Sequence, residues 1–173
     1  MIEFELLKDE EINYKLLYKW CSQEEIYRYF EQRPLSYKEI VNKYYPRTLK
    51  DTNIKVYIVK YNSVPIGMIQ YQKVDEKKNE LYEIKLKHAY EIDLFIGQLD
   101  LHNKSIGQEI INKMCNYLFD EKKAKHIIGS ILDENIKSLK CCQKCGFQLL
   151  KQIKMEDTIG ILKNYYIVIK NKE

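Results

Sequence analysis

The chain has 173 residues, and its 45% hydrophobic and 31% charged content is ordinary for a soluble globular domain with a sizeable core. The formal net charge of +4 is spread along the chain, so it does not by itself indicate a nucleic-acid-binding protein. No apolar run reaches the length that spans a bilayer, and the opening residues alternate with acidic ones instead of forming a secretory signal. We therefore expect one domain over residues 1–173 that acts in the cytoplasm, with no membrane or nucleic-acid partner.

The N-terminal third is predicted to be one strand followed by helices. Ile2–Leu7 has the alternation of a short strand. Three helical patterns follow, at Glu10–Trp20, Ser22–Phe30 and Ser36–Tyr45. Ser36 and Glu39 have the spacing of a capping box. Two strands are then expected, at Lys55–Val59 and Ile66–Val74, joined by turn-forming residues.

The rest of the chain alternates strands with helices and ends in a hairpin. Residues 75–87 are rich in lysine and glutamate, and we expect an exposed loop or a mobile strand there. The later elements are a strand at Tyr90–Ile96, a helix from about Ser105, a strand at Lys125–Ile131, a helix at Glu134–Lys144 ended by Gly146, and strands at Phe147–Ile153 and Leu162–Ile169. Seven strands with intervening helices indicate a mixed α/β (α+β) fold.

One stretch has the pattern of an anion site. Glu91–Gly97 reads as a strand, residues 103–107 as a short loop, and the amphipathic run after them as a helix that opens with the small residues Ser105 and Gly107. The first N–H groups of a helix lack internal partners and carry the positive end of its dipole, so small residues there let a phosphate approach. This favours a nucleotide-type cofactor, and the alternative is a surface helix without a ligand.

The cysteines give no clear metal or redox site. There are five of them, three close together: Cys21, Cys115, Cys141, Cys142 and Cys145. Without a signal peptide we expect reduced thiols. A tetrahedral zinc site needs two ligands beyond the one C-x-x-C spacing, and the three histidines have no paired spacing, so no metal is expected. Cys142 and Cys145 also lie in a lysine-rich helical stretch and not at a helix start, where thiolates are best stabilised.

Five motifs in order resemble the GNAT acyl-CoA-dependent N-acetyltransferase superfamily, and within it the aminoglycoside 6′-N-acetyltransferases. They are Trp20, Val64–Gln70, Tyr90–Gly97, Lys104–Gly107, and Asn135 with Gln143–Phe147. The resemblance runs from about Phe4 to Ile169. It implies the GNAT fold, a central mixed and mostly antiparallel sheet of about seven strands flanked by helices and splayed between the fourth and fifth strands.

The resemblance implies acetyl-CoA as co-substrate. The pantetheine arm is expected beside the fourth strand, with a backbone N–H of that strand aimed at the thioester oxygen, and the pyrophosphate is expected on the following loop and helix start. The implied cofactor-binding residues are Leu94, Phe95, Ile96, Asn103, Lys104, Ser105, Ile106, Gly107, Gln108 and Asn135. For Asn135 the alternative is a simple helix cap. Ser105 departs from the glycine that the family usually has, and His102 departs from a bulky aromatic residue.

The resemblance also implies two catalytic residues. Asp93 matches an aspartate that contacts the acceptor amine and is proposed as its base. An ordinary aspartate has a pKa of about 3.9, so the alternative is that Asp93 holds and orients the ammonium while water takes the proton. Cys142 stands where many members have a tyrosine that protonates the departing sulfur. The alternative is a core cysteine, with the thiolate protonated by water.

A polycationic sugar requires carboxylates around its amines and rings on which it can stack. The expected substrate-binding residues are Trp20, Glu31, Gln70, Tyr90 and Asp93. Ser130 replaces a family aspartate that contacts the aminoglycoside, which weakens that substrate assignment.

We expect direct transfer of an acetyl group to a primary amine in a ternary complex. The first hypothesis for the acceptor is the 6′-amine of an aminoglycoside. The alternatives are another small amine, such as a polyamine or a siderophore precursor, a protein N-terminus, or a non-catalytic acyl-CoA sensor. The expected state is a monomer or a homodimer.

Overall fold

The computed structural model describes residues 1–173. Its elements are β1 (Ile2–Leu6), α1 (Glu11–Cys21), α2 (Glu24–Phe30), α3 (Tyr37–Tyr44), the 3₁₀-helix η1 (Tyr45–Thr48), β2 (Ile54–Tyr61), β3 (Val64–Lys73), α4 (Glu76–Leu81), β4 (Ala89–Ile96), the 3₁₀-helix η2 (Leu99–Leu101), α5 (Ile106–Asp120), β5 (His126–Leu132), α6 (Ile136–Lys144), β6 (Gln148–Glu156) and β7 (Leu162–Asn171). The strand order is β1-β2-β3-β4-β5-β7-β6, a mixed and mostly antiparallel sheet of seven strands flanked by helices, as the resemblance predicts. No helix is both long and apolar enough to cross a bilayer.

The chain divides into two compact units. Unit 1 comprises residues 1–71 and 94–104, and unit 2 comprises residues 72–93 and 105–173. The family resemblance therefore extends over both units.

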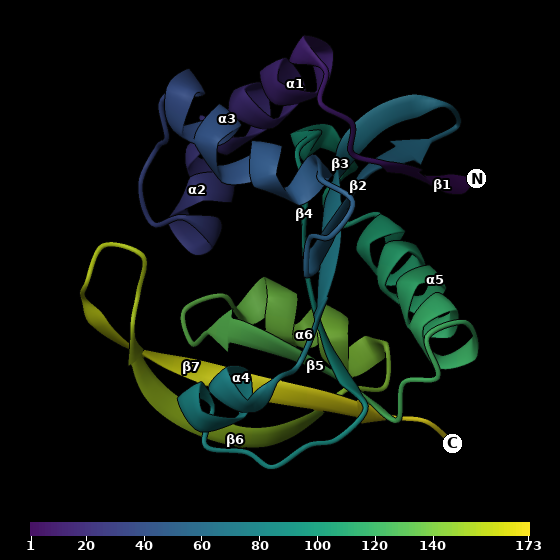
Figure 1. Ribbon diagram of the computed structural model, residues 1–173, viewed down its shortest axis with the longest axis vertical. Coiled ribbons are helices and arrows are strands. Elements are labelled where there is room, and N and C mark those ends of the chain that lie inside the picture. The colour runs from purple at the N-terminus through teal and green to yellow at the C-terminus, as the bar shows by residue number, and fades with distance from the viewer. The chain divides into compact units, whose positions relative to one another are not determined.

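Unit 1 has a core between its three helices and its strands. Helices α1, α2 and α3 lie side by side (Figure 1), because the apolar face of each one is buried against the others or against the strands. Leu17, Trp20 and Ile40 are among the most deeply buried side chains. The predicted capping box is confirmed: Ser36 Oγ accepts from the Glu39 N–H at 3.3 Å, and the Glu39 carboxylate accepts from the Ser36 N–H at 2.8 Å.

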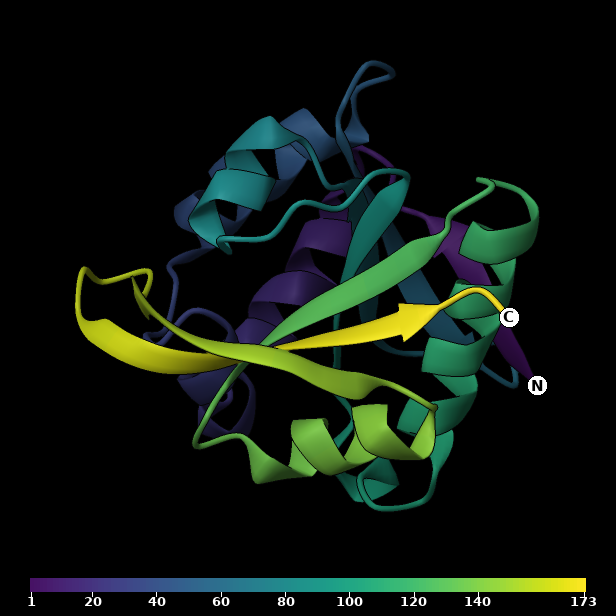
Figure 2. The same ribbon diagram turned by 90° about the horizontal axis from the view of Figure 1, so that it is seen from below.

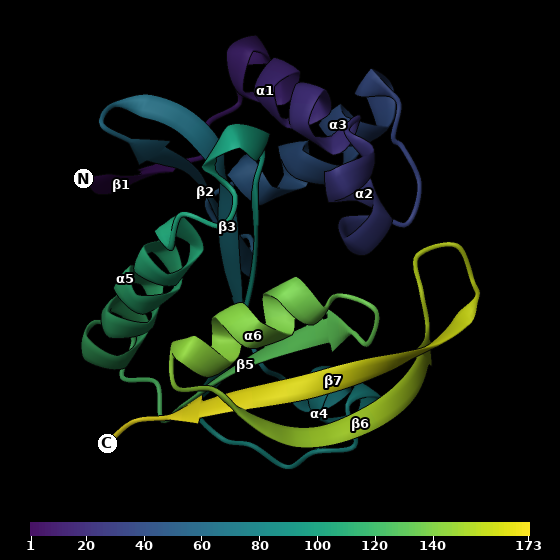
Figure 3. The same ribbon diagram turned by 180° about the vertical axis from the view of Figure 1, so that it is seen from behind.

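Unit 2 is built on the antiparallel strands β5, β7 and β6 (Figure 2). Helix α6 lies over one face of these strands and α4 over the other (Figure 3). The apolar positions predicted for α5 are all buried in the structure: Ile106, Ile110, Ile111, Met114, Cys115, Leu118 and Phe119. Gly146, at φ +85°, ends α6 in the left-handed conformation that favours glycine, as predicted.

The prediction of a loop or mobile strand at residues 75–87 is wrong for residues 76–81, which form α4, whereas residues 82–87 lie outside any helix or strand. The Asp75 carboxylate accepts from the Lys78 N–H at 2.9 Å and caps α4. The side chain of Asn79 then binds both the N–H and the carbonyl of Leu86, at 2.9 and 3.1 Å. Tyr82, only 2% exposed, anchors the segment. Local capping and one buried ring thus order a stretch whose composition resembles a solvated loop.

The pairing of the fourth and fifth strands covers only part of each strand, as expected for the predicted splay. Parallel pairing joins Ala89–Glu91 of β4 to His126–Ile128 of β5, although both strands continue beyond these residues. Strand β5, in contrast, is paired with β7 from His126 through Leu132. In this fold, β4 therefore ends with backbone that β5 does not pair.

Candidate active site

Asp93 is the only exposed residue of strand β4. Glu91 and Ile92 are buried, whereas Asp93 is exposed. Because side chains of a strand alternate between faces, Glu91 and Asp93 lie on the same face of β4. The chain therefore presents one exposed carboxylate and one buried carboxylate on that face.

The end of β4 is held tightly within unit 1. The Phe95 ring packs edge-on against Trp20 and Phe30, with ring centroids 6.2 and 5.0 Å apart. The Ile66 carbonyl of β3 accepts from the N–H groups of Gly97 and Gln98, at 2.7 and 3.0 Å. A rigid backbone at this point is what a strand must offer if it is to pair with a ligand or direct an N–H at it.

Two glycines allow this close packing. A Cβ atom on Gly67 would overlap the Phe95 carbonyl oxygen and lie 2.9 Å from Ile96 Cα. A Cβ atom on Gly97 would overlap the Trp20 ring. Trp20 itself is 1% exposed, so in this structure it supports the end of β4 and does not line a surface.

The loop after β4 is fixed by two side chains of unit 1. Gln23 Nε2 donates to the Gly97 carbonyl at 2.9 Å. His102 Nε2 lies 2.7 Å from the Ile96 carbonyl, and since a carbonyl only accepts, this nitrogen carries the proton. His102, which departs from the family pattern, thus connects the loop to the strand.

The start of α5 has an unusual backbone. Asn103 and Ser105 adopt left-handed φ angles of 62° and 61°, although neither is glycine. Such conformations cost about 1–3 kcal/mol in non-glycine residues and are concentrated at ligand-binding sites. The Ser105 side chain makes no capping hydrogen bond, so Ser105 contributes to the turn through its backbone conformation. The Ser105 carbonyl accepts from the N–H groups of Gln108 and Glu109, at 3.0 and 3.2 Å. The N–H groups of Ile106 and Gly107 come before these first helical donors and are the ones that this turn can offer to an anion.

Helix α6 contains the other residues that the sequence singled out. The Asn135 Oδ1 accepts from the Ser138 N–H at 3.2 Å, so Asn135 is the N-cap of α6. Cys142 is 8% exposed, and burial together with neighbouring cysteines raises the pKa of its thiol to about 12. Burial likewise raises the pKa of Cys141 and Cys21 to about 11 and that of Cys115 to about 12. All five cysteines are free thiols. Residues 1–173 contain no group of side chains arranged to hold a metal ion.

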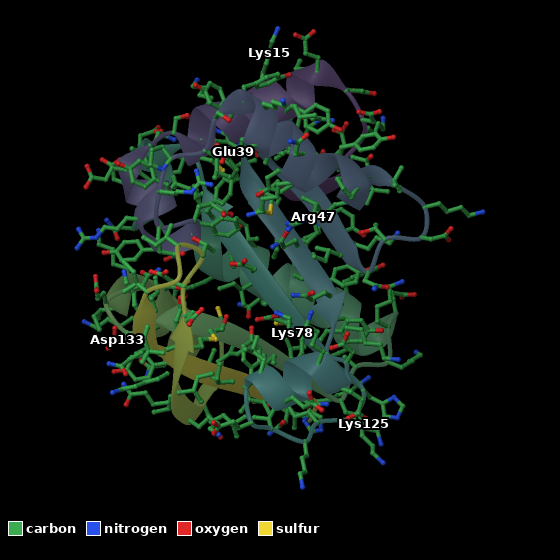
Figure 4. All side chains as sticks on the ribbon, turned by 60° about the vertical axis from the view of Figure 1, so that its left-hand side comes forward. Lys15, Glu39, Arg47, Lys78, Lys125 and Asp133 are labelled. Atoms are coloured by element: carbon green, nitrogen blue, oxygen red, sulfur yellow. The ribbon has the colours of Figure 1, made fainter.

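Two of the predicted substrate residues, Glu31 and Gln70, bind other side chains of unit 1. Glu31, 8% exposed, forms an ion pair with Lys43. Gln70 is 9% exposed, and its Oε1 accepts from Arg47 Nη1 at 2.8 Å. Figure 4 labels Arg47 on the segment after α3. Tyr90 is half-buried on β4.

A buried cluster around Glu91 was not predicted. Its members are Glu91, Tyr82, Ser130, Gln72 and Lys78. Burial and the Glu91 charge raise the pKa of the Tyr82 hydroxyl well above its usual value, with a further contribution from Asp93. The available signals were the capping residue Asp75 and the single aromatic residue, Tyr82, at the end of a charged run. Ser130, read from the sequence as a lost contact, belongs to this cluster.

The model of the acetyltransferase (GNAT) domain family matches residues 9–155 of this chain. The chain belongs to the GNAT acetyltransferase family. Among curated relatives, this GNAT domain is 26% identical over 154 residues to the acetyltransferase PseH of Campylobacter jejuni subsp. jejuni serotype O:2, and the match covers 87% of this chain and 85% of that protein.

Solved structures share the GNAT fold at low sequence identity. Aminoglycoside acetyltransferase AAC(6′)-Ib in complex with coenzyme A superposes with a TM-score of 0.82 at 17% identity, covering 99% of this chain and 95% of that chain. The same enzyme with coenzyme A and kanamycin gives the same values. Spermidine N-acetyltransferase from Vibrio cholerae, in complex with CoA and spermine, has a TM-score of 0.75 at 17% identity, over 98% of this chain and 95% of that chain. These neighbours establish the fold and bind coenzyme A themselves.

Substituting Ser105 tests the backbone at the start of α5. We expect Ser105→Gly to keep or raise Tm and to keep or tighten coenzyme A binding, because glycine adopts φ near 60° without steric cost and removes no cap. Ser105→Val should lower Tm, since a β-branched residue is strained in this region. Thermal unfolding and calorimetric titration with coenzyme A measure both effects. A tenfold or larger loss of affinity in Ser105→Gly would instead assign the anion contact to the hydroxyl.

Proposed function

We propose that this GNAT domain transfers an acetyl group from acetyl-CoA to a primary amine, by direct attack of the amine on the thioester. The observation that carries the proposal is the turn at the start of α5, where Asn103 and Ser105 hold left-handed conformations immediately ahead of the free N–H groups of a long helix. Helix α5, with 15 residues and one buried face, gives that turn a fixed dipole and a rigid support.

Each predicted cofactor contact has a physical role in this proposal. Ile106 and Gly107 offer backbone N–H groups to the pyrophosphate, with Lys104 adding positive charge, whereas the Gln108 N–H donates to the Ser105 carbonyl at 3.0 Å, so Gln108 would contact the ligand through its side chain. Leu94, Phe95 and Ile96 offer the backbone of β4 to the pantetheine arm, and the packing of Phe95 keeps that backbone in one conformation. Acetyl-CoA supplies an activated acyl group. The amide of Asn135, whose oxygen caps α6, can still donate.

Asp93 is proposed to bind the acceptor ammonium. The side chain is exposed on β4, and a carboxylate holds an ammonium by charge-assisted hydrogen bonds. The amine must lose its proton before it attacks, either to Asp93 or to a water beside it.

Cys142 is the weaker of the two catalytic predictions. A thiol with a pKa of about 12 would give its proton uphill to a thiolate of ordinary pKa, near 8.5. We therefore propose that coenzyme A leaves as the thiolate and takes its proton from solvent after the C–S bond has broken, and that Cys142 is a core residue of unit 2.

The acceptor has two candidates. The 6′-amine of an aminoglycoside is the finer proposal from the sequence resemblance, supported by a neighbour solved with kanamycin. A small amine with a single positive charge is the second candidate. The observation favouring it is that the buried carboxylates Glu31 and Glu91 each have a lysine of this chain as counter-ion, so neither adds negative charge for a polycation.

Release of coenzyme A thiol tests the activity. The protein is mixed with acetyl-CoA and a panel of kanamycin, spermidine, putrescine, n-butylamine and an N-terminal peptide, and thiol is followed with time. We expect amine-dependent release, with intersecting initial-rate lines because both substrates are bound together. Parallel lines would contradict direct transfer. If coenzyme A stabilises the protein against heat but no amine causes release of thiol, the protein is an acyl-CoA sensor and not an enzyme.

A further inference from the structure

Glu91 is a buried carboxylate whose four hydrogen bonds are all made within unit 2. Glu91 is only 5% exposed. Oε1 accepts from the Tyr82 hydroxyl at 2.5 Å and from Ser130 Oγ at 3.3 Å. Oε2 accepts from Gln72 Nε2 at 2.9 Å and from Lys78 Nζ at 2.6 Å. A carboxylate with two donors on each oxygen is held in one orientation.

Lys78 is the only cation among these four donors. Its Nζ also donates to the Tyr82 hydroxyl at 3.2 Å and lies over the Tyr82 ring, 5.1 Å from its centroid. The Lys78 side chain is 24% exposed, compared with 65% for Lys15, and it points from α4 toward the strands (Figure 4). The ammonium of Lys78 thus fills an ammonium site made by a carboxylate, a hydroxyl and a ring face.

The position of this ion pair matters because of Asp93. Glu91 and Asp93 are two positions apart on one strand, so their Cα atoms are about 6.6 Å apart and their side chains lie on the same face of β4. At that distance a second negative charge would attract a second ammonium of the acceptor. The charge of Lys78 cancels that of Glu91 before an acceptor arrives.

We propose that Lys78, acting through Glu91, makes this face of β4 selective for an acceptor that carries one positive charge. The inference rests on the proposed acetyl transfer and names the class of its acceptor. Lys78 is a positioning residue, because its ammonium contacts Glu91 and Tyr82 and need not contact the acceptor. A diamine long enough to reach from Asp93 to Glu91 meets a neutral pair there, and its second ammonium is repelled by Lys78.

Replacing Lys78 should reverse this preference. Putrescine and n-butylamine have the same carbon chain and differ in one ammonium, so the ratio of their kcat/KM values isolates the second charge. In Lys78→Met, we expect the ratio of putrescine to n-butylamine to rise about tenfold over the wild type, since the Glu91 carboxylate becomes available to the second ammonium. Lys78→Arg should keep the wild-type ratio because it keeps the charge.

Two further variants separate selectivity from stability. The double variant Lys78→Met with Glu91→Gln removes both charges and should return the ratio to the wild-type value, including if Lys78→Met alone unfolds. Lys151→Met, which removes a lysine paired with the exposed Glu83 at 2.9 Å, is the matched control and should not change the ratio. An unchanged ratio in Lys78→Met, or a ratio that also rises in the double variant, would overturn the proposal.

Calorimetry keeps the inference independent of catalysis. The two amines are titrated into each variant saturated with coenzyme A, and the ratio of their Kd values should follow the same order. If the wild type acetylates no amine of the panel, the proposed function fails, but the Kd ratio of putrescine to n-butylamine still decides the role of Lys78. Binding ratios that are equal in the wild type and in Lys78→Met would overturn it.

Discussion

Asp93→Asn is expected to lower kcat for the amine acceptor by about 100-fold or more while leaving the Kd for coenzyme A within about threefold. The asparagine keeps the shape of the side chain on β4 but removes the charge that holds an ammonium and the group that can take its proton. Asp93 is exposed, and substitutions at exposed positions usually change the free energy of unfolding by less than about 0.5 kcal/mol. Steady-state kinetics, together with a calorimetric titration of coenzyme A, measures the two quantities separately.

The matched control is Asp120→Asn. Asp120 lies at the end of α5, its side chain is 70% exposed, and its contact with Lys172 is 3.8 Å long. The substitution is chemically the same, and kcat should stay within twofold of the wild type. If Asp93→Asn kept more than about a third of the wild-type kcat, neither a base nor an ammonium-binding role for Asp93 would survive.

Gly67→Ala is expected to destabilise the protein by about 3 kcal/mol. The added methyl group would overlap the Phe95 carbonyl oxygen and lie 2.9 Å from Ile96 Cα, both of them backbone atoms that no rotamer change can move. Relief of the clash requires β3 and the end of β4 to separate, which breaks the bonds from Gly97 and Gln98 to the Ile66 carbonyl. Chemical denaturation gives the change in the free energy of unfolding.

Gly129→Ala provides the control on another strand. A methyl group at Gly129 would meet Val168 Cγ2 at 3.5 Å and the Ile92 carbonyl oxygen at 3.8 Å, which are ordinary contact distances. We expect a change of less than about 1 kcal/mol, with either sign, since alanine also restricts the unfolded chain. A similar loss of stability in both variants would show that glycine flexibility, and not close packing at Gly67, is responsible.

Much of the fold could be predicted because the local signals were consistent. The apolar spacing of α5 and the capping box of α3 each depend on neighbours within one or two turns, and both are confirmed. The helix at residues 76–81 was missed because the prediction relied on composition. Asp75 is a capping residue and Tyr82 a buried anchor, but the lysines and glutamates between them resemble a solvated loop. The number of charged residues in a segment does not indicate whether they lie on the exposed face of a helix or in a loop.

The candidate site could be predicted only in part. Asp93 and the start of α5 are consecutive features of one segment, so a motif can identify them, and their catalytic and binding roles stay predictions. The ion pairs of Glu31 with Lys43 and of Glu91 with Lys78 could not be found in this way, because each joins elements that are separated in the chain. The prediction of Glu31 as a substrate residue therefore did not take into account the lysine that neutralises its charge.

The buried thiols have a practical consequence for kinetics. Burial raises the pKa of all five cysteine thiols above the ordinary value, so at neutral pH they contain little thiolate, the form that attacks disulfide reagents. A chromogenic disulfide added to the reaction should consequently report coenzyme A as it is liberated, with little background from the polypeptide, and turnover can be recorded continuously.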